Sequence, residues 1–121
     1  MREIIELDGT EYLTHTYKFA SAYKKYLVDT GAAAAVAQAP ALTGKETPEE
    51  KTKIILEQNR KNTEEMVRLL YEDHADLTEK ILPMFVVLDK GEKLPSTRRM
   101  AAAMSHALND SDFMDFLLSL M

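Results

Sequence analysis

The sequence contains no cysteine, and its four glycines stand far apart. Without cysteine the chain has no disulfide, no thiolate metal site and no cysteine nucleophile. The isolated glycines form neither a phosphate-binding loop nor a dinucleotide-binding fingerprint, so no phosphate cofactor is indicated. A G-x-S-x-G sequence is also missing, and no spacing rule selects two carboxylates as an acid and base pair. These absences favour a non-enzymatic protein that holds no cofactor and no metal.

Long apolar runs and excess positive charge are missing as well. No run approaches the ~18 apolar residues that suggest a membrane span, and residues 1–10 lack the apolar segment of a secretory signal. Acidic residues outnumber basic ones by 20 to 15, which gives a net charge of −5. Such a charge repels the phosphate backbone of nucleic acids. We therefore expect a cytoplasmic protein that binds neither nucleic acid nor membrane.

The length of 121 residues fits a single domain over 1–121. Near the N-terminus, Asp8 and Gly9 lie between two β-leaning runs, which is a strong hairpin signal. It predicts antiparallel strands over 3–7 and 10–15. Helical patterns dominate the rest, so the expected fold is mainly α, a small helical domain with an N-terminal β-hairpin (α+β by strict count).

Helical spacing of apolar residues predicts a helix over 17–29, which ends before Gly31. Residues 31–46 are rich in alanine and are punctuated by glycine and proline. This run is too short to hold a helix without tertiary support. We expect a flexible connector there, or a short and poorly anchored helix.

Residues 47–50 form a capping box with proline at the first helical position, which predicts the start of a long helix. We expect this helix to reach about Asp73, and a break near Asn62 is the alternative. Residues 77–88 predict a buried helix bent at Pro83, with a strand over 84–88 as the alternative.

Two further helices are expected at the end of the chain. Ser96 predicts a helix cap, and the following helix carries Met100, Met104 and Leu108 on one face. Ser111 is the expected cap of the last helix. The alanines between the two methionines allow another helix to approach closely, inside the chain or between subunits.

Two polar clusters suggest alternative functions. The EDHAD stretch, residues 72–76, carries Glu72, Asp73, His74 and Asp76, which are residue types that bind divalent ions. It leaves open a metal-dependent enzyme. Arg98 and Arg99 stand in the first turn of a predicted helix, where a DNA-reading helix makes its base contacts, so a small DNA-binding regulator is a second alternative.

The last helix is the most informative segment. At 100° per residue, its apolar side chains cover roughly 200° of the circumference, against ~100° for an ordinary surface helix. Either the helix lies centrally in the fold, or another molecule covers part of it. Flexible methionines also line adaptable binding grooves. The candidate partner-binding residues are Met100, Met104, Phe113, Phe116, Leu117, Leu120 and Met121.

These segments resemble the tail assembly chaperones of long-tailed bacteriophages. The resemblance lies in a charged helix that runs into an apolar one, NTEEMVRLLYEDHADLTEKILPMFVVLD, and in the C-terminal NDSDFMDFLLSLM. A short strand pair that turns on Asp8 and Gly9, in IIELDGTEYL, is also typical of that family. The alanine-rich segment over 31–46 is not a feature expected of it.

The resemblance implies a non-enzymatic protein in the cytoplasm of a bacterial host. Its partner would be the tape measure protein, or another helical client, whose hydrophobic helices it keeps in solution while the tail tube assembles. The family also implies a homo-oligomer. A longer form made by ribosomal frameshifting occurs in many members, and this chain would match the short form.

Overall fold

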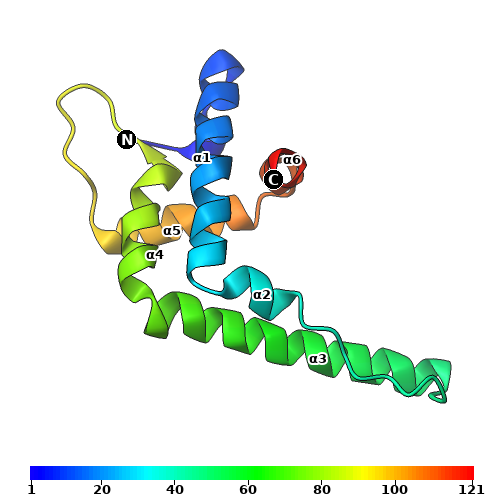
Figure 1. Cartoon of the computed structure of the whole chain (residues 1–121). Coiled ribbons are helices and arrows are strands. Elements are labelled where there is room, and N and C mark those ends of the chain that lie inside the picture. The colour runs from blue at the N-terminus through cyan, green and yellow to red at the C-terminus, as the bar shows by residue number, and fades with distance from the viewer. The chain divides into compact units, whose positions relative to one another are not determined.

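The structure, a computed structural model, describes residues 1–121. α-Helices make up most of it (Figure 1), which confirms the mainly α class. None of them is both long enough and apolar enough to cross a membrane. In chain order the elements are β1 (Arg2–Glu3), the 3-10 turn η1 (Ile4–Glu6), α1 (Gly9–Asp29), α2 (Ala32–Val36), α3 (Pro48–Arg68), the π-helical turn η2 (Leu69–Asp73), α4 (Ala75–Ile81), the 3-10 turn η3 (Leu82–Phe85), β2 (Val86–Val87), α5 (Thr97–Leu108) and α6 (Ser111–Leu120).

The chain divides into two compact units. Unit 1 combines residues 1–26 with residues 76–121, and unit 2 is formed by residues 27–75. Both ends of the sequence therefore belong to unit 1. That 1–121 acts as a single domain stays a prediction.

Three buried phenylalanines form the centre of unit 1. The ring centroid of Phe19 in α1 lies 4.8 Å from that of Phe85 in η3 and 5.9 Å from that of Phe113 in α6. All three side chains are almost completely buried. Aromatic rings at these separations gain about 0.5–1.5 kcal/mol per pair beyond the burial of their surface. The cluster joins three segments that are distant in sequence.

The two-stranded sheet contains the N-terminus, but its second strand is not the predicted one. β1 pairs with β2 in antiparallel register, with Arg2 opposite Val87 and Glu3 opposite Val86. Residues 10–15, predicted as the second strand, lie in α1. Gly9 has the positive φ of 57° that the hairpin turn also requires. The helix is favoured because it turns residues 12, 16, 19 and 23 toward the interior of unit 1 at helical spacing.

Glu3 connects the N-terminal strand to α5. Its carboxylate accepts hydrogen bonds from Arg99 Nη2 and pairs with His106 Nδ1, each at 2.8 Å. The side chain of Glu3 is only 9% exposed. Burial raises the pKa of Glu3, but the bonds from Arg99 and His106 outweigh burial, and its pKa lies below the ordinary value.

The predicted helix caps are confirmed in two of three cases. The side chain of Thr47 accepts a bond from the Glu50 amide, and that of Ser96 accepts one from the Arg99 amide. For α6, however, the cap is Asp110 and not Ser111, because Asp110 Oδ1 accepts from the Phe113 amide at 2.8 Å. Both residue types cap well, so sequence alone did not separate the two neighbours.

The segment over 77–88 is not one bent helix. α4 ends at Ile81, a 3-10 turn follows, and Val86 and Val87 form β2. Pro83 has no amide hydrogen and cannot continue the helical hydrogen bonds. The alternative strand over 84–88 is therefore confirmed at two residues.

In unit 2 the long helix is unbroken from Pro48 and reaches Asp73 through η2. Asn62, where a break was the alternative, is buried within it, and its amide donates to the carbonyl of Gln38 at 2.9 Å. This bond fastens the chain after α2 to α3. Within 31–46, residues 32–36 form α2, and Ala32 and Ala35 are buried. The flexibility of 31–46 stays a prediction.

We expect Glu3→Gln to lower the free energy of unfolding at pH 7 by about 2 kcal/mol, because charged hydrogen bonds to Arg99 and His106 are lost. The folded pKa of Glu3 is depressed, so its contribution is present above the unfolded pKa and is lost as pH falls through the folded value. Urea denaturation at pH 7 and at pH 3 checks both. An equal difference between wild type and variant at the two pH values would contradict this role.

Candidate docking surface of α1 and α6

α6 turns the middle of its wide apolar face into unit 1. Phe113 is 1% exposed and Leu117 is completely buried. α5 packs against α6, and Ala103 and Ala107 of α5 are completely buried as well. The small alanines let helices approach closely, as the sequence suggested, and in this structure the approach is inside the chain. The sequence left open whether the last helix lies centrally in the fold or is covered by another molecule. The structure answers this in part, because α6 contributes Phe113 and Leu117 to the core.

Four of the seven predicted partner-binding residues are core residues. Met100 and Met104 of α5 are 3% and 7% exposed, and Phe113 and Leu117 are buried with them. In this structure these four side chains are covered by their own chain, so they are not part of an accessible surface. They share the buried faces of α5 and α6 with Ala103 and Ala107.

The other three predicted residues reach the surface. Leu120 is 36% exposed, and Phe116 and Met121 are partly exposed. Leu118, which the candidate set omitted, is 62% exposed. At 100° per residue, Phe116 and Leu120 lie on one side of the buried stripe and Leu118 lies on the other. The wide apolar circumference thus consists of a buried centre with two exposed margins.

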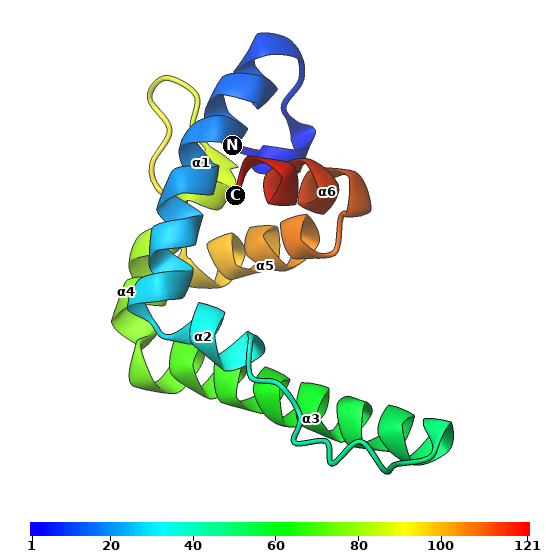
Figure 2. The same cartoon turned by 45° about the vertical axis from the view of Figure 1, so that its right-hand side comes forward.

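The margin that carries Phe116 and Leu120 lies next to α1. The ring centroids of Phe116 and Tyr12 are 5.6 Å apart, and Lys24 Nζ donates to the Met121 carbonyl at 3.4 Å. Figures 1 and 2 both show the C-terminal end of α6 beside α1. The C-terminal end of α6 therefore lies within reach of the Lys24 side chain of α1.

Two exposed apolar residues of α1 share a helix face with Lys24. Leu13 and Tyr17 are 54% and 69% exposed, and they precede Ala20 and Lys24 at spacings of three and four residues. Ala20 is buried, so this face of α1 is covered at Ala20 and open to solvent at Leu13 and Tyr17. We call Leu13, Tyr17, Phe116 and Leu120 the α1–α6 surface.

Sequence reasoning missed the α1 half of this surface. The prediction of a strand over 10–15 assigned Leu13 to a sheet and separated it from Tyr17. The available signal was the series Leu13, Tyr17, Ala20 and Lys24, which has helical spacing. Leu118 was visible in sequence as part of the second apolar stripe.

The two polar clusters singled out in the sequence, residues 72–76 and Arg98 with Arg99, each include a residue that forms an ion pair within the chain. Nowhere in the structure do three or more histidine, aspartate or glutamate side chains lie close enough to hold a metal ion. In the EDHAD stretch, Asp73 forms an ion pair with Arg68. Arg99 forms an ion pair with Glu3, which ties its guanidinium to the N-terminal strand.

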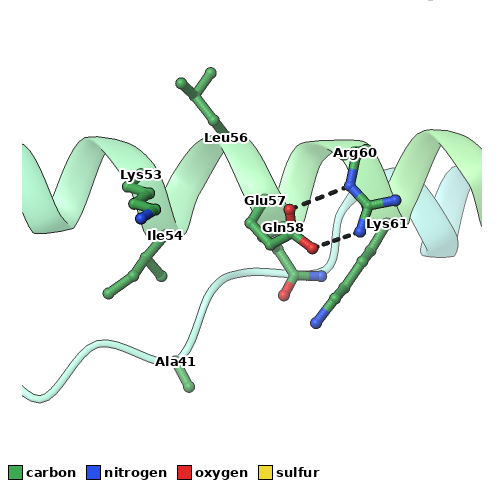
Figure 3. Close-up of a pocket in the computed structure, with 8 residues that line it drawn as sticks. All are labelled: Ala41, Lys53, Ile54, Leu56, Glu57, Gln58, Arg60 and Lys61. Carbon is green, nitrogen blue, oxygen red and sulfur yellow. Dashed lines mark hydrogen bonds and ion pairs between the residues drawn. The ribbon is translucent and has the colours of Figure 1, made fainter.

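Unit 2 has an open groove of about 690 Å³ along α3. Figure 3 shows Ile54 on the side of α3 toward Ala41, while Leu56 points away from it. Arg60 forms ion pairs with Glu57 and Glu64, so the charge of this arginine is neutralised within α3. The groove was not predicted from the sequence. Its lining mixes apolar, acidic and basic side chains, so it indicates one kind of ligand less clearly than the α1–α6 surface does.

The buried and exposed positions of α6 predict opposite mutational costs. We expect Leu117→Ala to lower the free energy of unfolding by about 3 kcal/mol, because it leaves a cavity in the core. The neighbouring Leu118→Ala should change it by less than about 0.5 kcal/mol. Urea denaturation of both variants measures the difference. Similar costs at the two positions would contradict the placement of α6.

Comparison with known proteins identified no relative of this chain. No family model, no curated protein and no solved structure matches the chain. The function is therefore inferred from the surface chemistry described above and from the resemblance noted in the sequence.

Proposed function

We propose that the chain is a non-enzymatic binding protein whose α1–α6 surface docks one amphipathic helix of a partner protein. The observation that carries the proposal is a set of four apolar side chains on α1 and α6, of which Leu13, Tyr17 and Leu120 are exposed and Phe116 is half-buried against Tyr12 of α1. Apolar side chains from two adjacent helices are the usual seat of a helix-in-groove complex. Docking removes Leu13 and Leu120 from water, which favours association.

The partner we propose is a hydrophobic helical segment of a bacteriophage tape measure protein. The support for this identity is the sequence resemblance to tail assembly chaperones, together with the surface itself. A chaperone of this kind binds apolar helices in the bacterial cytoplasm and shields them until the tail tube is built. Self-association, also implied by the resemblance, would cover the same side chains in the absence of a client, and a client helix would then displace the second copy.

The docking proposal is tested with a designed 18-residue peptide that has leucines on one helical face and glutamines on the other. Fluorescence anisotropy of the labelled peptide should show saturable binding to the wild-type protein. The double variant Leu13→Glu with Tyr17→Glu should bind about tenfold more weakly, because docking would then bury carboxylates against leucines. Both side chains are exposed, so the fold is retained, and circular dichroism checks this.

Leu94→Glu is the matched control for that variant. Leu94 is 55% exposed, nearly the same as Leu13, but it lies in the loop before α5. The control should bind the peptide as wild type does. Equal losses in both variants, or no binding by any protein, would rule out the α1–α6 surface as the docking site.

The tape measure assignment makes its own prediction. We expect a very long helical reading frame to adjoin the gene of this chain, and co-expression with this chain should raise the soluble fraction of that protein several-fold. The variant Leu13→Glu with Tyr17→Glu should remove most of the increase. If the neighbouring genes encode no such protein, the tail-assembly role is wrong, while docking of a helix by the α1–α6 surface can still be measured with the peptide.

A further inference from the structure

A small pocket adjoins the α1–α6 surface inside unit 1. Its volume is about 280 Å³, and it lies between the segment that follows β1, the start of α1 and the start of α6. Its walls combine apolar side chains with three carboxylates. The lining residues are Ile5, Leu7, Asp8, Tyr12, Asp110, Asp112 and Phe113.

The carboxylates of this pocket have no cationic partner within the chain. No ion pair reaches Asp8, Asp110 or Asp112. Asp8 and Asp112 are exposed, while Asp110 uses one oxygen to cap α6. Arg2, the arginine on β1, pairs with Glu11 and Asp89. Residues 100–121 contain no lysine and no arginine.

Tyr12 reports the same negative potential. The pKa of its phenol is raised, first by burial and then by the charges of Asp110 and Asp112. Two carboxylates thus act on the ring that forms one wall of the pocket. The same ring contacts Phe116, at a centroid distance of 5.6 Å. Tyr12 therefore connects the pocket to Phe116 of the α1–α6 surface.

We infer that the helix docked on the α1–α6 surface carries an arginine or lysine whose side chain enters this pocket. The inference rests on the proposed function and specifies the chemistry of its partner. A long basic side chain matches both kinds of wall, because its methylene groups pack against apolar residues while its head group stays near charge. Ile5, Leu7 and Phe113 supply the apolar contacts, and Asp8 and Asp112 supply the charge. The ring of Tyr12 adds a favourable site for a cation.

The position of the pocket fixes the pattern of the partner. Phe116 and Leu120 of α6 receive apolar side chains, and the pocket lies beyond Phe116 toward the start of α6. A docked helix therefore presents its basic residue at one end of its apolar face. An acidic residue at that place would meet Asp8 and Asp112 and be repelled, so the pocket also selects the direction of the helix.

The test compares the leucine–glutamine peptide with four relatives, each of which has a single arginine at a different place along the boundary of its leucine face. At low salt we expect at least one of them to bind about fivefold more tightly than the parent peptide. The gain should shrink as sodium chloride is raised, because screening weakens the charge pair. The parent peptide should show no such dependence.

Variants of the protein test whether the tighter binding of the arginine peptide depends on the pocket. Asp8→Asn with Asp112→Asn should abolish this gain, so that this variant binds the arginine peptides no more tightly than the parent peptide. Asp115→Asn is the matched control, because Asp115 is an exposed carboxylate of α6 that does not line the pocket. This control should keep the full gain. A gain that survives in the pocket variant, or is lost equally in the control, overturns the inference.

Two other outcomes separate the inference from the proposed function. If all peptides bind equally and Leu13→Glu with Tyr17→Glu still weakens them, the helix docks without a basic anchor, and only the inference is wrong. If no peptide binds, and light scattering shows a dimer that the same double variant dissociates, a second copy of the chain occupies the surface. That result overturns both proposals.

Discussion

The contact of Phe19, Phe85 and Phe113 is the interaction on which unit 1 depends. It joins α1, η3 and α6, three segments that are distant in sequence. Because Phe113 must point into this cluster, the rotation of α6 about its own axis is fixed. Leu117, one turn later, is then buried as well, while Phe116 and Leu118 are turned toward the two margins. The exposed apolar side chains are thus a direct result of core packing.

The same rotation explains why apolar and acidic features meet at one end of α6. Asp110 caps the helix and Asp112 lies in its first turn, where negative charge is favoured by the helix dipole. Their carboxylates stabilise the helix start and, at the same time, make the nearby pocket electronegative. In the proposed complex, side chains that serve the fold therefore also define which partner fits. This dual use is consistent with a binding protein that recognises a helix by apolar contact and by charge.

Local signals in the sequence predicted the helix boundaries that depend on neighbouring residues. Thr47 with Pro48, and Ser96, define caps within four residues, and both caps are present. The strand partner of Glu3 was not predictable in this way, because Val86 is distant in sequence and pairs through tertiary contacts. Apolar spacing also identified α6 as unusual, but it could not tell which of its stripes faces Phe19. Only the packed structure separates core residues such as Met104 from surface residues such as Leu118.

The division of unit 1 into two sequence segments has a consequence for its synthesis on the ribosome. Residues 1–26 are translated before residues 76–121, so Phe19 can contact Phe85 and Phe113 only after the intervening residues have been made. Contacts of such long sequence separation slow folding. The buried side of α1 therefore stays uncovered until residues 76–121 have been made, and the arrival of α6 closes the core of unit 1.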